Sequence, residues 1–229
     1  MSIYLAYCSQ YLNVTTLNES KTFNITKSID YSKVHSIPYY NNTEKLTKRY
    51  NEIIKRLANE DCIVVLVHDD VVITDKDWIN KLQLGLQKYD VIGLAGTAEA
   101  SIRQPCLWHI MGPREKHTGA VTHVNFSDNS TFTTHFGKTG RALILDGLFL
   151  AFNPKKLFSK GAMFDESNPC VAHFYDIDFC LTCNKHQLTM GTVNIQATHS
   201  SPGLKSFTKD WLDGQDWFLN KYNRGGYSN

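Results

Sequence analysis

The segment Ile63-Val-Val-Leu-Val67-His68-Asp69-Asp70 decides the fold of this chain. Its five consecutive apolar residues, four of them β-branched, are typical of a strand that is covered on both faces. The run stops at a histidine and two carboxylates. In an open α/β sheet, ligands bind beyond the carboxyl ends of the strands. We therefore expect His68, Asp69 and Asp70 to lie at the edge of a cleft.

Amphipathic helices are expected on both sides of this strand. Before it, residues 46–57 carry apolar side chains at spacings of three and four, with Asn42 or Thr43 as the expected N-cap. After it, Thr74 and Asp77 fit a capping box that begins a second helix. Each helix therefore has one apolar face to bury against a sheet.

Two further strands are expected at residues 2–7 and 91–95, which are short apolar runs. The order strand, helix, strand, helix, strand indicates an α/β fold, because such units pack as right-handed crossovers of one sheet. The sequence therefore predicts a mostly parallel, doubly wound central sheet.

The second half of the chain is less regular. Residues 97–142 contain one expected hairpin, in which residues 124–126 and 132–136 flank a turn. This hairpin predicts a small antiparallel addition to the fold. Residues 143–152 then form an expected core strand that is interrupted at Asp146-Gly147.

The last expected elements are a helix that begins near Asp176, a strand at residues 192–196 and a closing amphipathic helix at residues 208–222. His199 follows shortly after the expected strand, so it too would lie at a strand end. Cys180-x-x-Cys183 lies on an apolar helical face without a second pair of ligands at zinc-site spacing. We interpret these two cysteines as core residues.

The composition is that of a globular protein with one hydrophobic core: 229 residues, of which 42% are hydrophobic and 20% charged. A net charge of +2 without a dominant basic stripe argues against a nucleic-acid-binding protein. No apolar stretch reaches the ~18 residues of a membrane span, and the N-terminus lacks the features of a signal peptide. Six cysteines without scaffold-like spacing favour a reduced, cytoplasmic setting.

Several carboxylates could carry chemistry. Asp69 and Asp70 repel each other unless a cation is near, and a divalent ion with bound diphosphate oxygens would supply that charge. They could instead serve the next helix, although later acids already fill that role. Asp176 and Asp178 include one group that can cap a helix and one that can face a pocket, although both could serve the helix dipole. Asp146 interrupts an apolar strand, where an uncompensated charge is costly; it either faces a cleft or is locally hydrogen-bonded.

These pieces, in this order, resemble the GT-A-fold nucleotide-diphospho-sugar glycosyltransferases, and most closely the family-2-like enzymes. The resemblance extends from about Ile3 to Tyr222. The segments that carry it are Val67–Val71, Gly93–Gly96, Trp108, Asp146-Gly147, Phe164-Asp165, His173–Leu181 and His199–Gly203. The sequence departs from the family's D-x-D motif at His68, which stands in place of the first acid.

The resemblance implies a divalent-metal-dependent enzyme that moves a sugar from a nucleotide diphosphate sugar, most commonly a UDP-sugar, to a hydroxyl of a glycan or glycoconjugate. Residues 1–229 would form one GT-A catalytic domain, with a nucleotide-binding half at 1–96 and an acceptor-binding half at 97–229. The chemistry is consistent with the residues, because a divalent ion stabilises a leaving diphosphate and a carboxylate deprotonates the nucleophile.

Carried over to this sequence, the family's metal site falls on Asp70 and His199, which would hold Mn²⁺ or Mg²⁺ against the donor diphosphate. His68 could also ligate the metal, with one negative charge fewer than an aspartate. Asp176 matches the general base that takes the proton of the acceptor hydroxyl. Asp178 would orient its helix or hold the acceptor.

The resemblance also implies a second set of residues, which would contact the sugar donor. Asp69 would contact the donor ribose or sugar, and Asp146 would line the donor-sugar or acceptor pocket. Trp108 would belong to the acceptor side or to the packing beneath it. The residues that could hold the nucleobase of the donor are Tyr7 and Cys8, with Arg49 or Asn51.

Two other classes of function are compatible with the sequence. A non-catalytic module that binds a nucleotide sugar or a carbohydrate is favoured by His68 in place of an acid. A metal phosphohydrolase or nucleotidyltransferase is suggested by the pair His68-Asp69. The hydrolase would require further metal-ligating histidines on helices. The remaining histidines of the irregular segment, which we interpret as hydrogen-bonding loop residues, are His109, His117, His123 and His135.

Overall fold

The computed structural model of this chain describes residues 1–99, 107–201, 203 and 206–223. Its larger sheet has the strand order β11 (Met190–Thr192), β5 (Val91–Gly93), β10 (Phe149–Phe152), β3 (Cys62–Val67), β1 (Ser2–Cys8) and β2 (His35–Tyr39). The pairs β1–β2, β1–β3 and β5–β11 are parallel, whereas β10 runs antiparallel between β3 and β5. The predicted mostly parallel sheet is therefore confirmed.

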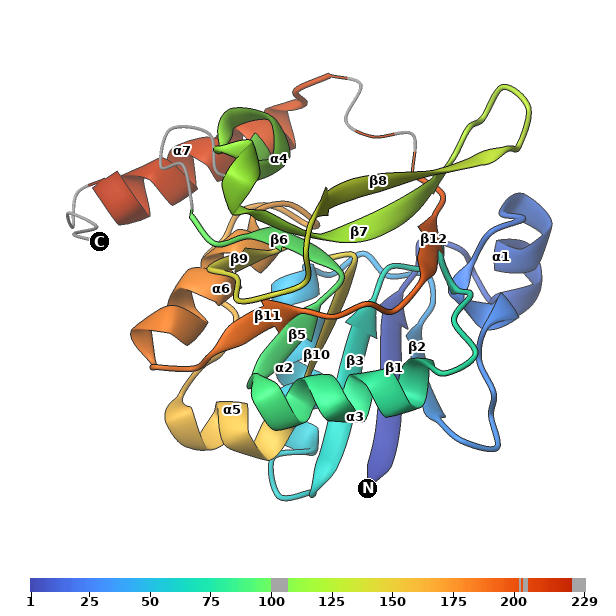
Figure 1. The fold of residues 1–229 in the computed structure, drawn as a ribbon, viewed down its shortest axis with the longest axis horizontal. Coiled ribbons are helices and arrows are strands. Elements are labelled where there is room, and N and C mark those ends of the chain that lie inside the picture. The colour runs from blue at the N-terminus through green and yellow to red at the C-terminus, as the bar shows by residue number, and fades with distance from the viewer. Residues whose placement is uncertain (100–106, 202, 204–205, 224–229) are drawn as a thin grey trace.

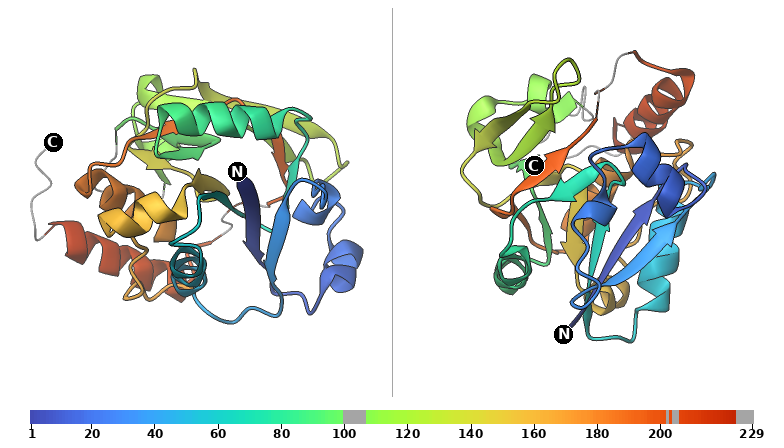
Figure 2. Two further views of the ribbon diagram at one scale, coloured as in Figure 1. Left: turned by 90° about the horizontal axis from the view of Figure 1, so that it is seen from below. Right: turned by 90° about the vertical axis from the view of Figure 1, so that its right-hand side faces the viewer.

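Helices cover both faces of this sheet, as a doubly wound fold requires. α3 (Trp78–Lys88) lies on one face, and α2 (Leu46–Arg56) and α5 (Pro154–Lys160) lie on the other (Figures 1 and 2). All six residues of β3 are buried, which explains its unbroken apolar run. Because Ala6 pairs with Leu66, the residues that follow β1 and β3 emerge side by side.

A second sheet, which also has six strands but slightly fewer residues in them, lies across the carboxyl ends of β1 and β3 (Figure 1). Its strand order is β4 (Val71–Ile73), β12 (Ala197–His199), β7 (His117–Val124), β6 (Ala95–Thr97) and β9 (Ile144–Leu145), with β8 (Thr131–Gly137) paired to β7. The predicted hairpin is the antiparallel pair β7–β8. Apart from the parallel pair β7–β12, this sheet is antiparallel, so the predicted antiparallel addition is also present.

The smaller sheet brings the end of β12 to the end of β3. β4 begins directly after Asp70, and β12 pairs with it antiparallel so that His199 lies opposite Val71. The main-chain N–H of Ser200 donates to the carbonyl of Asp70 over 2.9 Å. Two segments that are far apart in the sequence therefore meet beyond the carboxyl ends of the larger sheet. The halves 1–96 and 97–229 share that larger sheet, because β10 and β11 belong to the second half.

The remaining helices are short at the N-terminal end of the chain and longer at its C-terminal end. They are α1 (Val14–Ser20), α4 (Trp108–Met111), α6 (Tyr175–Lys185) and α7 (Lys209–Asn223), with 3₁₀ turns η1 (Ile25–Lys27) and η3 (Arg114–Lys116). α7 is the predicted closing helix; its Trp211 and Phe218 are buried against Phe174. Within the described ranges, none of these helices has the length and apolar character of a membrane span.

The predicted helix caps are wrong. α2 begins after Lys45, which makes no capping bond with its side chain. The Asn42 side chain instead donates to the Glu44 carbonyl and accepts a hydrogen bond from Arg49. α3 begins after Asp77 rather than after Thr74. The Asn42 side chain is thus used by other hydrogen bonds, and at α3 the main-chain N–H of Thr74 donates to the Gln196 carbonyl.

The predicted strand at residues 192–196 is also wrong. β11 ends at Thr192, and β12 begins only at Ala197. The chain between them crosses from the larger sheet to the smaller one, and its Gln196 carbonyl accepts the main-chain N–H groups of Thr74 and Asp75. The five described cysteines are all free, and Cys180 and Cys183 are buried in α6 as predicted. Cys106 and Pro202 lie outside the described residues.

Candidate active site

Three predicted metal ligands meet where β3 and β12 end. One ligand atom from each of His68, Asp70 and His199 lies within 4.8 Å of the other two. Nε2 of His199 is 3.3 Å from Oδ1 of Asp70, and the ring centroids of His68 and His199 are 5.6 Å apart. The structure thus assembles two imidazoles and one carboxylate around a common point.

The environment of Asp70 is cationic. Burial raises the pKa of Asp70, but the adjacent His199, together with the charges of His68 and Lys21, outweighs burial and holds the pKa at about 2. Burial lowers the pKa of His199, but Asp70 reverses that effect and the net shift is upward. Oδ1 of Asp70 is buried, and among the described residues it accepts no hydrogen bond of good geometry. A buried carboxylate oxygen that lacks a hydrogen bond and faces two imidazoles fits a site for a divalent cation.

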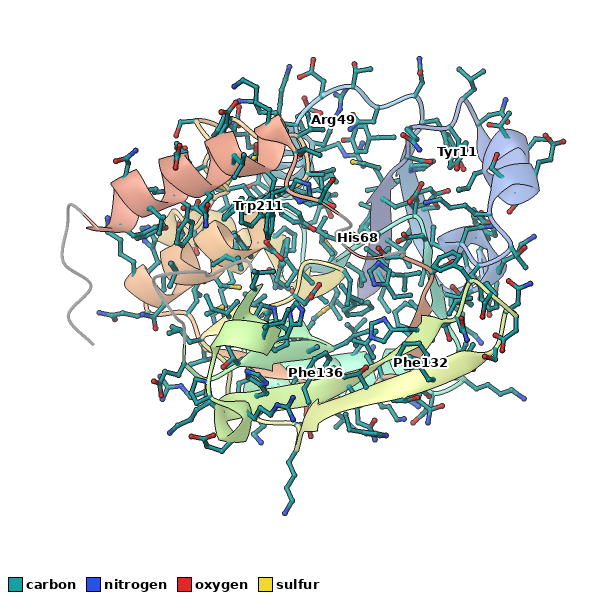
Figure 3. All side chains as sticks on the ribbon, turned by 90° about the horizontal axis from the view of Figure 1, so that it is seen from above. Tyr11, Arg49, His68, Phe132, Phe136 and Trp211 are labelled. Atoms are coloured by element: carbon teal, nitrogen blue, oxygen red, sulfur yellow. The ribbon has the colours of Figure 1, made fainter. Side chains whose placement is uncertain are left out.

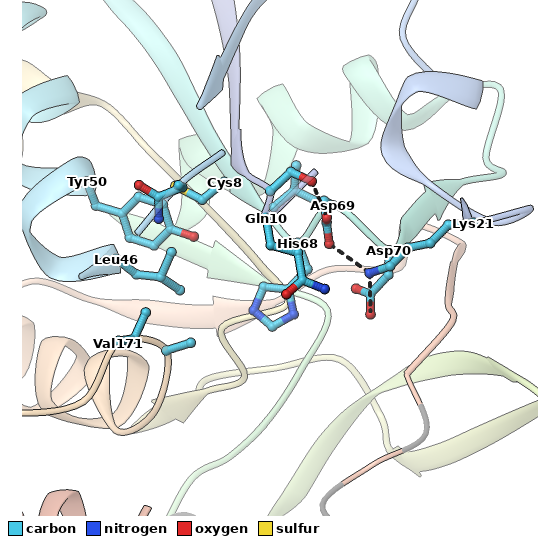
Figure 4. Close-up of a pocket in the computed structure, with 13 residues that line it drawn as sticks. Cys8, Gln10, Lys21, Leu46, Tyr50, His68, Asp69, Asp70 and Val171 are labelled. Atoms are coloured by element: carbon cyan, nitrogen blue, oxygen red, sulfur yellow. Dashed lines mark hydrogen bonds and ion pairs between the residues drawn. The ribbon is translucent and has the colours of Figure 1, made fainter. Parts of the chain in front are cut away.

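A lysine that sequence reasoning missed lies at this site. Nζ of Lys21 is 3.1 Å from Oδ1 of Asp69 and 3.9 Å from Oδ2 of Asp70 (Figure 4). Ser9 completes the environment of Asp69 by donating its hydroxyl to Oδ2 over 2.7 Å. Lys21 follows directly after α1, and the main-chain N–H of Ile25 donates to the carbonyl of Asp69, which fixes this segment beside the strand end.

A cavity of about 300 Å³ opens beside these groups. Residues from the ends of β1 and β3 and from α2 line it, including Cys8, Gln10, Lys21, Tyr50, Asp69 and Asp70 (Figure 4). One side of the cavity is therefore charged, and the other is formed by less polar side chains. Such a combination of apolar walls with a few convergent polar groups is typical of small-molecule sites.

Asp176 lies in a different electrostatic environment. Its carboxylate accepts the main-chain N–H groups of Gly147 and Ile177, each over 2.9 Å. Burial, and then the charge of Asp146, raises the pKa of Asp176 to about 7 in spite of these bonds. Residue 147 must be glycine, because a Cβ there would lie 2.2 Å from the Tyr175 hydroxyl. The glycine allows α6 to begin directly against the break between β9 and β10.

The two groups of side chains are joined through Tyr175. Nε2 of His68 lies 2.8 Å from the Tyr175 hydroxyl, which donates to the Gly147 carbonyl over 3.0 Å. The charge of Asp146 acts on the pKa values of His68, His199 and Asp176. Asp146 is therefore near both the metal-ligand cluster and Asp176. Its own Oδ1 accepts the N–H of Leu148 over 3.1 Å.

Asp178 and Trp108 make contacts that hold elements of the fold together. Asp178 is only 1% exposed, and its Oδ1 accepts bonds from Nζ of Lys221 at 2.5 Å and from the Tyr222 hydroxyl at 2.6 Å. These bonds hold α7 on α6. Trp108 is buried, and its ring packs on His117 and Phe136 beneath the β7–β8 hairpin.

Of the four residues predicted to hold the donor base, only Cys8 lines the cavity. The Tyr7 ring is buried, and its hydroxyl lies 2.7 Å from that of Tyr40. Asn51 binds both the N–H and the carbonyl of Phe164 and so ties α2 to the segment before α6. Arg49 bonds to Glu52 and packs over the Tyr39 ring. The bonds of Tyr7 and Asn51 join residues far apart in the sequence, so the local sequence pattern does not predict them.

The interpretation of the central histidines as loop residues is wrong for all four of them. His117 and His123 lie on β7, and His135 lies on β8, whereas His109 is in α4. His123 pairs in register with His199, and their ring centroids are 6.3 Å apart. The local sequence gives no signal for His123, because this residue reaches the cluster through the pairing of β7 with β12.

Comparisons with known proteins agree with this geometry. Residues 14–222 match the glycosyltransferase-like family. Among solved structures, GalNAc-T7 with UDP, GalNAc and Mn²⁺ has a TM-score of 0.58 at 7% identity, covering 96% of this chain and 48% of the other. A197 from STIV has a TM-score of 0.49 at 9% identity, with coverage of 88% and 86%. TarS 1-349 from S. aureus has a TM-score of 0.44 at 14% identity, with coverage of 88% and 61%.

No curated protein matches the sequence significantly. The likeness to GalNAc-T7 concerns the fold, because its sequence identity is low. The family match, in contrast, covers the strand end with its acids, the Asp176 helix and the closing helix in one alignment. This chain belongs to the glycosyltransferase-like family and has the GT-A fold.

Proposed function

We propose that this protein is a divalent-metal-dependent glycosyltransferase that transfers a sugar from a nucleotide diphosphate sugar, with UDP favoured as the nucleotide, to a hydroxyl of a glycan or glycoconjugate. The observation that carries the proposal is the meeting of His68, Asp70 and His199, and the hydrogen bonds that connect His68 through Tyr175 and Gly147 to Asp176. A transferase of this class needs positive charge at the leaving diphosphate and a base at the acceptor hydroxyl.

The donor would bind in the cavity beside β1 and β3. Lys21 can donate to the diphosphate, and Asp69 can accept hydroxyl groups of the ribose or the sugar. Cys8 and Tyr50 supply the less polar wall that a nucleobase requires. UDP is favoured by the likeness to GalNAc-T7, whose structure contains UDP and Mn²⁺.

His68, Asp70 and His199 would hold the metal. When bound, a divalent ion supplies positive charge that stabilises the leaving diphosphate. Two imidazoles favour transition ions such as Mn²⁺ over Mg²⁺, which prefers oxygen ligands. A histidine at position 68, in place of an acid, therefore favours Mn²⁺ over Mg²⁺.

Asp176 would act as the general base. It takes the proton of the acceptor hydroxyl while that oxygen forms a bond to the anomeric carbon. The bond from the anomeric carbon to the diphosphate oxygen breaks, and its electron pair leaves with the diphosphate. A pKa of about 7 suits this role, because a base works best when its pKa lies near the operating pH. Attack opposite the leaving group gives inversion of configuration.

One observation favours the alternative of a non-catalytic binding module. Lys21 already neutralises part of the charge of Asp69 and Asp70 without a metal. A protein that had lost turnover could retain that arrangement and bind a nucleotide sugar through the lysine alone. Metal dependence and hydrolysis of the donor separate the two functions.

The test is a donor screen by thermal shift, with and without Mn²⁺, followed by measurement of donor hydrolysis. We expect one class of nucleotide diphosphate to raise Tm only when Mn²⁺ is present, because ligand binding to the native state stabilises it. Its sugar conjugate should be hydrolysed slowly to free sugar. Binding that is independent of metal, without hydrolysis of any donor, would favour the module.

A further inference from the structure

A continuous row of four rings runs from the metal-ligand cluster to the surface of the β7–β8 hairpin. The ring centroids of His68 and His199 are 5.6 Å apart, those of His199 and His123 are 6.3 Å apart, and those of His123 and Phe132 are 5.4 Å apart. In Figure 3, Phe132 lies along the hairpin on the side of the cleft opposite Tyr11 and Arg49, and His68 lies between these two sides.

Strand pairing fixes this row. His199 of β12 is the partner of His123 of β7, and His123 is the partner of Phe132 of β8. Directly opposed residues of paired strands project to the same face of a sheet. Thr134 shares that face with Phe132, because residues two apart on a strand project in the same direction. The row is therefore a property of the sheet rather than of a loop.

The outer end of the row is exposed and chemically mixed. Phe132 is 56% exposed. Its neighbours along β8 are polar, namely Thr131, Thr133, Thr134 and His135. An exposed aromatic ring with polar neighbours in its strand does not form the broad apolar patch that a lipid or a protein partner would need.

We propose that this face of the hairpin is an acceptor site for an oligosaccharide, in which a pyranose ring stacks on Phe132. The proposal rests on the proposed glycosyltransferase function. A pyranose presents C–H groups on its faces, which suit the electron-rich face of an aromatic ring, and hydroxyl groups around its rim. His123 and Thr134 offer hydrogen-bonding groups for those hydroxyls.

The position of Phe132 also indicates the size of the acceptor. His123 separates Phe132 from His199, which belongs to the metal-ligand cluster. The sugar on Phe132 is therefore not the sugar whose hydroxyl reacts, but one further along the same glycan. It follows that a monosaccharide acceptor would not use this contact, whereas a longer acceptor would.

The hairpin provides a matched control. Phe126 belongs to the turn between β7 and β8 and is 56% exposed, like Phe132. The substitutions Phe132→Ala and Phe126→Ala thus remove the same side chain from the same hairpin at the same exposure. Phe132→Trp retains an aromatic face and tests whether stacking, rather than the shape of phenylalanine, is required.

The experiment measures binding to a printed oligosaccharide array in the presence of UDP and Mn²⁺, together with Mn²⁺-dependent UDP binding and donor hydrolysis. We expect the wild-type protein, Phe126→Ala and Phe132→Trp to bind the same oligosaccharides. Phe132→Ala should bind them at least about tenfold more weakly. Its UDP binding and donor hydrolysis should stay within about twofold of wild type, because Phe132 is remote from the donor cavity.

The inference is overturned if Phe132→Ala binds oligosaccharides as well as the wild type does. It is also overturned if both alanine variants lose binding equally, which would indicate a general disturbance of the hairpin, or if wild type binds UDP and hydrolyses a donor but binds no oligosaccharide. Failure of the wild type to bind any nucleotide would instead contradict the proposed function, and oligosaccharide binding without nucleotide binding would leave a sugar-binding module.

Discussion

Asp70 and Asp176 carry the same chemical group, but the charges around their carboxylates differ in sign. Asp70 faces His68, His199 and Lys21, which hold its pKa at about 2. Asp176 faces Asp146, and its pKa is raised to about 7. Burial raises the pKa of both residues, so burial alone does not separate them. The neighbouring charges decide which carboxylate is suited to hold a cation and which to accept a proton.

The largest effect on binding and transfer is expected from substitution of Asp70. Asp70→Asn removes the only carboxylate of the described metal-ligand cluster, so Mn²⁺-dependent UDP binding should be lost and transfer should fall by roughly 10³-fold or more. Isothermal titration of Mn²⁺ and UDP measures this loss. Asp77→Asn, just before α3, is the control and should bind both like wild type. Unchanged Mn²⁺ affinity in Asp70→Asn would remove Asp70 from the metal site.

Substitution of Asp176 should affect catalysis and not ligand binding. Asp176→Asn is expected to lower kcat about 10²- to 10³-fold, with Mn²⁺ and UDP affinities unchanged, because the general base is lost. In the wild type, kcat should decrease as the pH falls below about 7, since Asp176 becomes protonated there. A pH–rate profile of wild type and variant checks both points. If the variant kept the wild-type limb near pH 7, another group would be the base.

Lys21 sharpens the comparison, because its two roles predict effects of opposite sign. In Lys21→Met, Mn²⁺ alone should bind more tightly, since an ammonium no longer neutralises Asp69 and Asp70. UDP should bind about tenfold more weakly, since a charge-assisted hydrogen bond to the diphosphate is lost. Titrations of each ligand separately measure the two effects. Lys27→Met, on the exposed surface of η1, is the matched control; a change of the same sign for both ligands would contradict the assignment.

Asp178 should show the smallest effect on function. Asp178→Asn weakens the bonds from Lys221 and Tyr222 that hold α7, so we expect a loss of about 1–3 kcal/mol in the free energy of unfolding. UDP affinity should change little. Urea denaturation measures the free energy of unfolding, and UDP titration measures the affinity for UDP. A large loss of transfer with full stability would show instead that Asp178 belongs to the catalytic groups.

The sequence predicted the parts of this site that depend on local pattern. The buried run of β3 located the acids that follow it, and the interrupted strand at Asp146-Gly147 located the break beside Asp176. Lys21 and His123 were missed because each reaches the site through contacts that span many residues, a salt bridge to Asp69 in one case and the pairing of β7 with β12 in the other. Neither contact produces a periodicity in its own segment.

Polar side chains were harder to place from the sequence than the buried strands. Asn42 and Thr74 satisfy the local rules for helix caps, but the structure uses Asn42 to hold Arg49 and begins α3 three residues later than predicted. Asn51 looked like a group for the donor base, yet its amide holds the backbone of Phe164. Hydrogen bonds elsewhere in the chain thus use the polar side chains of Asn42 and Asn51, which local patterns assigned to a nearby backbone or to a ligand.

The most direct test of the account is pulsed EPR spectroscopy of Mn²⁺ bound to the protein together with UDP. The account predicts ¹⁴N modulation from two imidazoles, those of His68 and His199, and the loss of one of them in His68→Asp, which still binds Mn²⁺ through a carboxylate. Bound Mn²⁺ without nitrogen modulation in the wild type, or modulation unchanged in His68→Asp, would contradict it.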